Sequence, residues 1–501
     1  MRWSGTRAAA VLAALFLSCL VPSRAFAVDR ALLDKLVNGD NDEKIEAIGA
    51  IVAGGDPQAP AILNRLAEGE VEIDGKKEEV VVNNRVRSAV ASALGALNLL
   101  SPDRNSRLAA ARALAEGAPA SMLPLVRKAR EKEADAEIKG VLDIVVAGID
   151  IKSDDKQARI AAIRLLGSSN AKTLLLEAAS DADEDVRLEA QKSLRAVEGR
   201  LGVGEWIGLG FAGVSLASIL LLAALGLAIT YGLMGVINMA HGELIMIGAY
   251  TTYVVQNMFR GSGFFDWYLA AAIPAAFAVS AAVGMLLERS VIRWLYGRPL
   301  ETLLATWGIS LILIQAVRTL FGAQNVQVEN PSFMSGGIQL MANVVLPWNR
   351  IMIIFFAFAV VLLMYALLSK TKLGLYIRGV TQNRAMASCV GVPTARVDTW
   401  AFGLGSGIAG LAGCALSQVG NVGPDLGQGY IVDSFMVVVF GGVGQLAGTV
   451  VAALVLGFAN KLLESWSGAV IAKIVVLVFI IFFIQRRPQG MFAVKGRAVE
   501  T

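Results

Sequence analysis

The feature that most constrains this chain is a series of apolar runs of about 20 residues between positions 206 and 484. A helix of that length crosses the hydrocarbon core of a bilayer, which is about 30 Å thick. Inside lipid, a helix satisfies all of its backbone hydrogen bonds within itself. Residues 28–200 are different, because they are rich in Ala, Asp, Glu, Lys and Arg. The sequence therefore predicts an all-α protein in which a polar N-terminal domain precedes a polytopic bundle embedded in the lipid bilayer.

The first 27 residues have the pattern of a secretory signal peptide. Arg2 and Arg7 precede an apolar run over 8–21, and Ala25-Phe26-Ala27 supplies the small residues that flank a cleavage site. We therefore expect residues 1–27 to be removed and the domain at 28–200 to lie in the periplasm.

Residues 28–200 contain an internal repeat with a period near 50 residues. Each of three copies reads as three consecutive helical segments, and the first copy is lengthened by residues 71–82, where Asp74-Gly75 predicts a hairpin turn. The pattern resembles HEAT-like repeats, which stack into an α-solenoid. We expect a protein-docking surface here, and no residue pattern in the repeat suggests catalysis. Three apolar positions align the copies: Ile45, Leu108 and Ile160.

The membrane domain is predicted at 201–490, with a cytoplasmic tail at 491–501. We expect seven or eight spans. The segment 431–463 is too long for one span and is interrupted by glycines at 441–448, so it is interpreted as a re-entrant hairpin. Residues 421–430 are expected in the periplasm. Arginines between spans and at the C-terminal end favour the cytoplasm for those loops and for the C-terminus. The seven full spans are expected at 206–231, 232–250, 267–287, 303–317, 350–369, 400–420 and 468–484.

Polar side chains interrupt two of the predicted spans. Ionisable groups at membrane depth are expensive and usually face the bundle interior or a cavity. An alternative is that those near 241 are wetted by water at the inner surface, and that the hydroxyl stripe near 306 only packs helices together. The residues proposed to line a substrate path are Asn238, His241, Glu243, Thr306, Ser310 and Gln315.

A basic loop at 372–396 lies between two spans and contains no acidic residue. The positive-inside rule places it in the cytoplasm. Its apolar positions between Leu375 and Val390 are spaced as in an amphipathic helix, which Gly391 and Pro393 would end. Such a helix could be pushed by a soluble partner, although a simple linker would also satisfy the charge rule.

Several function classes are excluded by what the sequence contains. With three cysteines and one histidine, a disulfide framework and a zinc site of ordinary spacing are excluded. The chain has no phosphate-binding G-x-x-x-x-G-K-[ST] loop, no catalytic triad and no metal cluster, so no cofactor or enzymatic activity is expected. The net charge of +4 follows from the cytoplasmic loops and requires no nucleic-acid partner. Any energy source must belong to another subunit.

Four motifs in order resemble the permease subunits of branched-chain-amino-acid-type (LivH-like) ABC importers: GLAITYGLMGVINMAHGELIMIGAY, ERSVIRWLYGRP, the basic loop and FGGVGQLAGTVVAALVLG. The resemblance covers nearly all of 206–490. Within that family, the block at 298–326 and the exported repeat domain look like the urea-importer permease.

The resemblance implies a multi-pass protein of the bacterial inner membrane that works with cytoplasmic ATP-binding subunits, a second homologous permease subunit and a periplasmic solute-binding protein. Urea is the first expected solute, with branched-chain amino acids or short amides as alternatives. A passive channel and a membrane-anchored periplasmic scaffold are the competing classes. The basic loop corresponds to the segment that docks on the ATPase, and the residues implied for that coupling are Arg378, Asn383, Arg384 and Gly391.

Overall fold

The computed structural model describes residues 30–54, 59–73, 76–80, 82–115, 118, 122–169, 171–341 and 343–492. The expected signal peptide and all but two residues of the expected tail lie outside these ranges. The chain divides into two compact units, Met1–Leu201 and Gly202–Thr501. Both are mostly helical, as predicted, and the described strands form two short hairpins.

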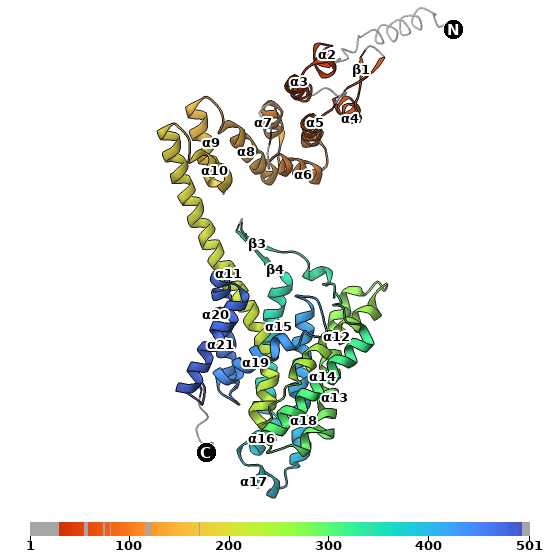
Figure 1. Cartoon of the computed structure of the whole chain (residues 1–501), viewed down its shortest axis with the longest axis vertical. Coiled ribbons are helices and arrows are strands. Elements are labelled where there is room, and N and C mark those ends of the chain that lie inside the picture. The colour runs from red at the N-terminus through yellow and green to blue at the C-terminus, as the bar shows by residue number, and fades with distance from the viewer. Residues whose placement is uncertain are drawn as a thin grey trace, which may run out of the picture. The chain divides into compact units, whose positions relative to one another are not determined.

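In unit 1 the structure has a helix at each of the nine segments where the repeat predicted one (Figure 1). β1 (Glu70–Ile73) pairs antiparallel with β2 (Lys76–Glu79), as the hairpin prediction requires, and Ile73 lies opposite Lys76. The predicted turn residues Asp74 and Gly75 lie outside the described residues. The helices of this unit are α2 (Arg30–Asn38), α3 (Asn41–Gly54), α4 (Ala59–Glu68), α5 (Asn84–Leu97), η1 (Asn98–Leu100), α6 (Arg104–Ala115), α7 (Leu123–Lys132), α8 (Ala136–Asp150), α9 (Lys156–Ser168), α10 (Lys172–Ala178) and the start of α11 (Glu184–Met234).

Equivalent positions of successive copies make equivalent ion pairs. Arg104 at the start of α6 binds Asp135 and Glu137, each at 2.7 Å. The equivalent residue at the start of α9, Lys156, binds Asp183 at 3.1 Å and Asp185 at 2.6 Å. In both copies the first of the two acids also caps the next helix through its backbone N–H groups. The repeat seen in the sequence is therefore also a repeat of contacts.

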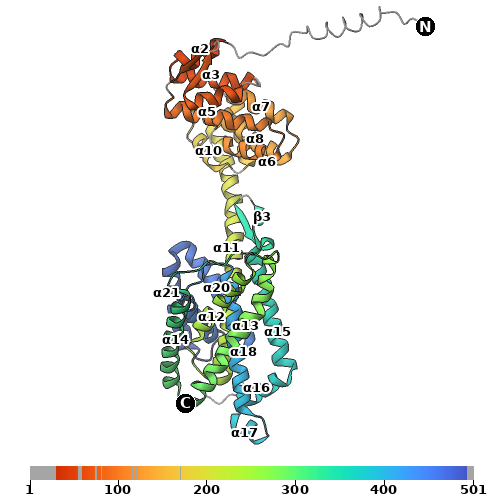
Figure 2. The same ribbon diagram turned by 90° about the vertical axis from the view of Figure 1, so that its right-hand side faces the viewer.

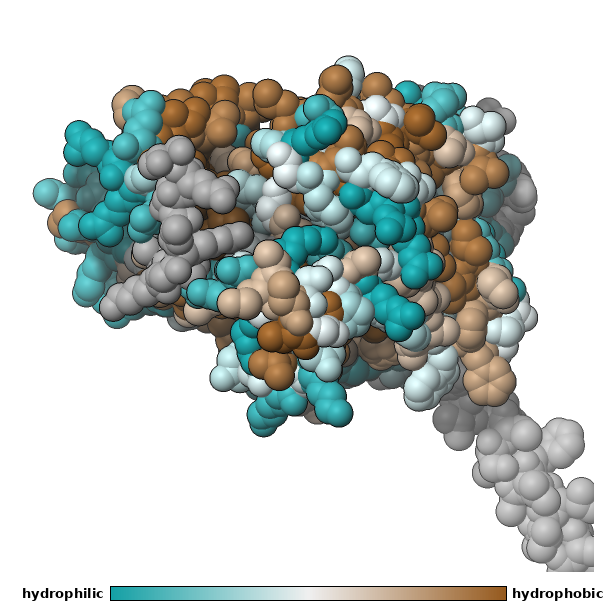
Figure 3. Space-filling model, turned by 90° about the horizontal axis from the view of Figure 1, so that it is seen from below, coloured by the Kyte–Doolittle hydropathy of each residue, from teal (hydrophilic) through white to brown (hydrophobic). Residues whose placement is uncertain are grey.

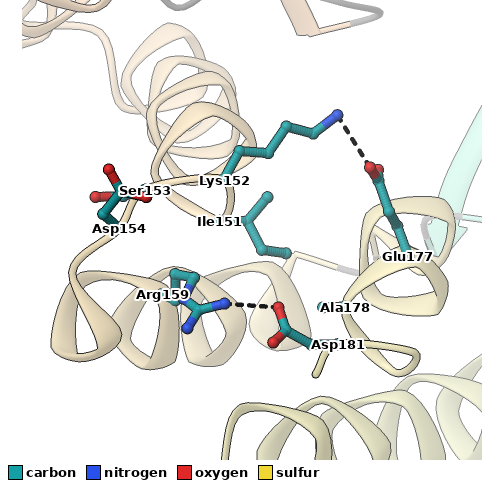
Figure 4. Close-up of a pocket in the computed structure, with 8 residues that line it drawn as sticks. All are labelled: Ile151, Lys152, Ser153, Asp154, Arg159, Glu177, Ala178 and Asp181. Carbon is teal, nitrogen blue, oxygen red and sulfur yellow. Dashed lines mark hydrogen bonds and ion pairs between the residues drawn. The ribbon is translucent and has the colours of Figure 1, made fainter. Parts of the chain in front are cut away.

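A second pair of equivalent ion pairs uses a glutamate in one copy and the shorter aspartate in the next, and the two make different numbers of hydrogen bonds. Glu133 binds Arg107 through two hydrogen bonds, at 2.8 Å and 3.2 Å. The shorter Asp181 reaches only one nitrogen of Arg159, at 2.7 Å, and the buried Nε of Arg159 has no partner among the described residues. A groove of about 340 Å³ opens beside this second pair (Figure 4).

The ion pair between Glu133 and Arg107 predicts how the stability of unit 1 changes with pH. The Arg107 hydrogen bonds, with backbone N–H groups, hold the pKa of Glu133 below its ordinary value. A lowered pKa stabilises the fold above the unfolded-state pKa, and this contribution is lost as the pH falls through the folded-state value. In a fragment spanning 28–200, Glu133→Gln should lower the free energy of unfolding at pH 7 by about 1–2 kcal/mol. Urea denaturation should show the difference shrinking below about pH 4.

The matched control for this variant is Glu177→Gln, which removes the carboxylate of an exposed pair with Lys152. It should change the free energy of unfolding by less than about 0.5 kcal/mol. Equal effects of the two substitutions, or a Glu133→Gln effect independent of pH, would contradict the assignment. A fragment without helical far-UV signal would show that unit 1 does not fold alone.

Unit 2 is a helical bundle with one small hairpin between α14 and α15 (Figures 1 and 2). Its further elements are α12 (His241–Phe259), η3 (Phe265–Trp267), α13 (Tyr268–Ser290), η4 (Ile292–Trp294), α14 (Pro299–Phe321), η5 (Ser332–Met334), β3 (Gly337–Met341), β4 (Val344–Pro347), α15 (Trp348–Lys370), α16 (Lys372–Gln382), α17 (Arg384–Cys389), α18 (Thr394–Ser417), α19 (Gln428–Gly441), α20 (Leu446–Ser467) and α21 (Ala469–Arg486).

Within the described residues, seven helical stretches are long and apolar enough to cross a membrane. They include α11, α13, α14, α15, α18, α20 and α21. The predicted break at 441–448 is confirmed, because α19 ends at Gly441 and α20 begins at Leu446 after Gly442 and Gly444, both with positive φ. The hairpin interpretation needs correction, since α20 has 22 residues and is a full span, whereas α19 has only 14.

Glycines let α18 pack directly on the backbone of its neighbours. A Cβ on Gly413 would lie 1.9 Å from the carbonyl oxygen of Ile245 in α12, and one on Gly405 would lie 2.7 Å from that of Gly226 in α11. The segment 405–410 (GSGIAG) has the G-x-G-x-x-G spacing of a dinucleotide-binding loop, but it lies within α18 and its glycines are helix contacts, so the spacing has no such meaning here.

Candidate translocation path

In unit 2 the chain turns back at a first broken element, a non-helical segment between two helices that lies inside the bundle. α11 ends at Met234, the chain continues without helix from Gly235, and α12 begins at His241. The Nε2 atom of His241 lies 2.9 Å from the carbonyl oxygen of Ala223, which is about 16 Å before the end of α11. The segment 235–240 therefore turns back into the bundle, and α12 begins beside α11 about three turns before the end of that helix.

The turn-back segment is held by α14. The backbone N–H of Met239 donates to Oγ1 of Thr306 at 3.1 Å, and Ser310, one turn further along, lies close to the carboxyl group of Glu243. Five of the six proposed path residues thus come together: Asn238, His241, Glu243, Thr306 and Ser310. Gln315 does not join them, because it lies on the exposed face of α14.

Three of these side chains carry buried polar atoms without a partner among the described residues. They are Nδ2 of Asn238, Nδ1 of His241 and Oε2 of Glu243, and the three residues are 2%, 0% and 2% exposed. Buried polar atoms are nearly always hydrogen-bonded, so three unpaired ones within six residues of the chain indicate room for a ligand or water. Their burial argues against the alternative that His241 and Glu243 lie in bulk water at the inner surface.

A second broken element follows α18, where the chain again turns back into the bundle before the next helix, α19, begins. Gln418 follows α18 at the end of the bundle where α13 and α15 begin, since it binds Tyr268 at 3.1 Å and Asn349 at 3.0 Å. The chain then turns back to Gly427, where a Cβ would lie 1.9 Å from the carbonyl oxygen of Gly242. α19 therefore begins at the same depth as α12.

This second element was missed by the sequence analysis, which expected 421–430 in water outside the bundle. The last part of that segment lies inside, against α12. The available signal was the density of glycines at 420, 423, 427 and 429, which allow a backbone to approach another closely.

A cavity of about 270 Å³ lies between α11, the first turn-back segment and α19. Its lining is mainly apolar, and the ring centroids of Tyr231 and Phe435 are 5.8 Å apart. Asn238 is one of the lining residues, but its unpaired amide nitrogen is buried and the accessible surface of the cavity is almost entirely apolar. Small-molecule sites are typically lined by apolar and aromatic side chains, as this cavity is. The lining residues are Leu227, Tyr231, Ile237, Asn238, Met239, Leu303, Ile431, Val432 and Phe435.

The basic loop forms two helices rather than the single one predicted. Asn383 lies between α16 and α17 with extended backbone angles, and its side chain accepts a hydrogen bond from Met386 N at 2.9 Å. Asparagine competes with helix hydrogen bonds in this way, which is why it divides the segment. Gly391 has φ = +85° between α17 and α18, as expected for a residue that ends a helix.

The two arginines proposed for coupling to an ATPase instead contact groups of this same chain. Arg384 forms an ion pair with the buried Asp398 of α18, and its guanidinium lies 4.9 Å from the ring centroid of Tyr296. Arg378 donates to the carbonyl oxygen of Leu368. These residues therefore position α16 and α17 on the bundle.

The outer face of α16 and α17 carries large apolar side chains. Leu375, Met386 and Val390 are 59%, 63% and 74% exposed. The opposite face packs Ile377 and Ala387 into a cluster with the start of α18. Hydrophobic and hydrophilic residues lie side by side in the view of the molecule from below (Figure 3). An exposed apolar face among basic residues is a candidate docking surface.

Comparison with known proteins agrees with this geometry. A family model described as "branched-chain amino acid transport system / permease component" matches residues 210–484. LivH, a high-affinity branched-chain amino acid transport system permease protein of Escherichia coli (strain K12), is 28% identical over 289 residues, which is 56% of this chain and 93% of LivH. BraD of Pseudomonas aeruginosa is 27% identical over 287 residues, with the same shares covered.

A more distant relative is LivM of Salmonella typhimurium, which is 25% identical over 303 residues, 55% of this chain and 68% of LivM. No solved structure matches. The 7% of LivH outside its alignment is too short to contain a counterpart of unit 1. The family match takes in more than half of the chain, including both broken elements and α16 to α18. The chain therefore belongs to the family of permease components of branched-chain amino acid transport systems.

Proposed function

We propose that this chain is the permease subunit of an ATP-binding-cassette importer and that a small polar solute passes the cavity beside Asn238. The observation that carries the proposal is the group of unpaired buried atoms on Asn238, His241 and Glu243 at a helix that begins inside the bundle. A purely structural bundle would leave these costly groups without a role. Thr306 and Ser310 belong to the same path, while Gln315 is not included.

Urea is the first candidate solute. The block at 298–326 and the repeat domain ahead of the bundle support it, because both resemble the urea-importer permease. A branched-chain amino acid is the second candidate. The largely apolar cavity favours it, because an aliphatic side chain would fit there, and so do the names of the relatives.

The proposed partners follow from the same surfaces. The exposed apolar face of α16 and α17, formed by Leu375, Met386 and Val390, docks on a cytoplasmic ATP-binding subunit. A second permease subunit is proposed because LivH and LivM are both named as permease proteins. A periplasmic solute-binding protein completes the proposed importer. ATP is hydrolysed by the separate subunits.

We further propose that unit 1 is an exported HEAT-like solenoid that docks a protein in the periplasm. The boundaries are those of the sequence: 1–27 signal peptide, 28–200 solenoid, 201–490 membrane domain and 491–501 cytoplasmic tail. The two broken elements, added to the seven full-length helices, make an odd number of crossings. An odd number suits an N-terminal domain outside the inner membrane and a C-terminus inside.

Transport is tested with the co-expressed importer in proteoliposomes that hold ATP and carry the binding protein outside. Labelled urea should accumulate only with ATP, and unlabelled leucine in excess should not compete. Accumulation of leucine but not urea would favour the second candidate. Uptake of either solute without ATP would indicate a passive channel, and uptake of neither would reject the proposal.

Orientation is tested by single cysteines in a background that lacks Cys389 and Cys414. Cysteines at Ser153 and Pro331 should react with an impermeant thiol reagent from the periplasm. Those at Ser388 and Val494 should react only after the membrane is opened. Labelling of position 388 from the periplasm would overturn the topology.

Docking on the ATPase is tested by Met386→Glu, which places a charge on the exposed apolar face without touching the cluster beneath. Co-purification of the ATP-binding subunits should fall at least about tenfold, since burying an unpaired charge costs more than about 1.4 kcal/mol. The matched control is Leu340→Glu, at an exposed apolar position of β3. It should leave co-purification unchanged, and an intact complex with Met386→Glu would reduce α16 and α17 to a linker.

A further inference from the structure

The groove beside Arg159 in unit 1 can be compared with the same place in the preceding copy of the repeat. Arg107 in α6 and Arg159 in α9 each lie three residues after the first residue of their helix. Glu133 and Asp181 each lie two residues before the acid that caps the following helix. The two arginine–acid pairs are therefore equivalent, and a difference between them comes from their own side chains.

In the earlier copy all three nitrogens of the Arg107 guanidinium are hydrogen-bonded. Nε and Nη2 donate to the two oxygens of Glu133 at 2.8 Å and 3.2 Å, so one carboxylate spans that edge of the guanidinium. Nη1 donates to the carbonyl oxygens of Ser101 and Pro102 at 3.1 Å and 3.0 Å. The arginine is satisfied, and the Glu133 side chain that covers it is only 5% exposed.

In the next copy the edge of Arg159 that carries Nε and Nη2 meets no carboxylate of the described residues. Asp181 is one methylene shorter, and both of its oxygens already accept hydrogen bonds. Oδ2 accepts from Nη1 of Arg159 at 2.7 Å, and Oδ1 accepts from the backbone N–H of Asp183 at 2.9 Å. Nε of Arg159 is buried and unpaired, whereas Nη2 is not among the buried unpaired atoms and is therefore open to the groove.

The groove in front of Arg159 offers both apolar contact surface and a second cation. Its volume of about 340 Å³ lies within the range of about 300–1,000 Å³ that is usual for ligand pockets. Ile151 and Ala178 line it and are 7% and 6% exposed. Lys152 extends to Glu177 at 3.0 Å (Figure 4). Both side chains of this pair are more than half exposed, so the pair is weak and the ammonium is free to turn to another acceptor.

The charges that line the groove are compatible with an anion. The pair of Lys152 with Glu177 and the pair of Arg159 with Asp181 each sum to zero. Asp154 is the remaining acid of the lining, and its exposure to water weakens its effect on a neighbouring charge. A carboxylate at Nη2 would gain a charge-assisted hydrogen bond, on the same guanidinium edge that a carboxylate spans in the preceding copy.

We propose that this groove binds a carboxylate of a partner protein, presented on an acidic side chain or at a chain end, in the role that Glu133 has in the preceding copy. The inference rests on the proposed docking role of unit 1 and specifies its site and the chemistry of its partner. The carboxylate oxygens accept hydrogen bonds from Nη2 of Arg159 and from Lys152. The carbon atoms beside the carboxylate pack on Ile151 and Ala178.

The test measures the reactivity of single arginines in the whole purified chain, by phenylglyoxal modification and peptide mass spectrometry. Arg159 should react faster than Arg107, because Glu133 already covers the equivalent edge of Arg107. An Arg159 no more reactive than Arg107 would show that the edge is closed and would overturn the proposal.

Three peptides then serve as probes of the groove. Acetyl-Ala-Glu-Ala-amide carries an acidic side chain, and acetyl-Ala-Ala-Ala with a free C-terminus carries the carboxylate at its end. At least one of them should slow the reaction of Arg159 about threefold or more, and the one that does identifies the source of the carboxylate. The neutral control, acetyl-Ala-Gln-Ala-amide, should not. Slowing by neither carboxylate peptide, or equal slowing by the control, would reject the site.

A reciprocal pair of variants tests the role of the missing methylene group. Asp181→Glu restores the longer acid, so Arg159 should become as unreactive as Arg107 and the protection should disappear, with the helical far-UV signal unchanged. Glu133→Asp should make Arg107 reactive and protected by the same peptide, and this result does not depend on the folding of Asp181→Glu. Protection that survives in a folded Asp181→Glu chain would overturn the site.

Orientation separates failure of the site from failure of the docking role. Labelling of the Ser153→Cys chain only from the cytoplasm, together with peptide protection of Arg159, would keep the carboxylate site and reject docking in the periplasm. Labelling from the periplasm without any protection would reject the site alone.

Discussion

The close approach of backbones at glycine is the constraint on which the bundle depends. Gly242 against Gly427 and Gly405 against Gly226 leave no room for a Cβ, so the segments meet through peptide groups. Non-helical backbone at membrane depth is tolerated only where protein or a cavity covers it. Because α12, α13 and α18 pack this tightly, the turn-back segments can lie inside the bundle and present polar atoms there without exposure to lipid.

The sequence predicted those parts of the fold that depend on local pattern. The helices of the repeat in unit 1, its hairpin and the break after Gly441 followed from periodicity and turn residues. Asn238, His241 and Glu243 were proposed because polar residues in an apolar run have few structural uses, and all three are buried. Thr306 and Ser310 were proposed from their shared helix face, which is buried and on which Gln315 does not lie.

What the sequence could not predict depends on contacts between distant segments. Nothing local distinguishes the residues before α19 from a periplasmic loop, because their position is set by Gly427 meeting Gly242. The roles of Arg378 and Arg384 likewise depended on partners elsewhere in the chain, Leu368 and Asp398. Charge alone suggested that these arginines face another protein. Asn383, interpreted only as part of a motif, divides the loop into two helices through its own side chain.

Helix α18 connects the proposed docking face on α16 and α17 to the helices α11 and α12 beside the proposed solute path. Arg384 in α17 is tied to Asp398 in the first turns of α18, and the cluster containing Ile377, Ala387 and Val397 fixes the two docking helices to the same helix end. α18 in turn meets α11 at Gly405 and α12 at Gly413, on either side of the point where α12 begins. Close-packed contacts without intervening side chains transmit displacement rather than absorb it. A movement of α16 and α17 imposed by an ATPase would therefore reach α12 through α18 and alter the spacing at Gly242 and Gly427, close in the chain to Asn238 and the cavity proposed for the solute.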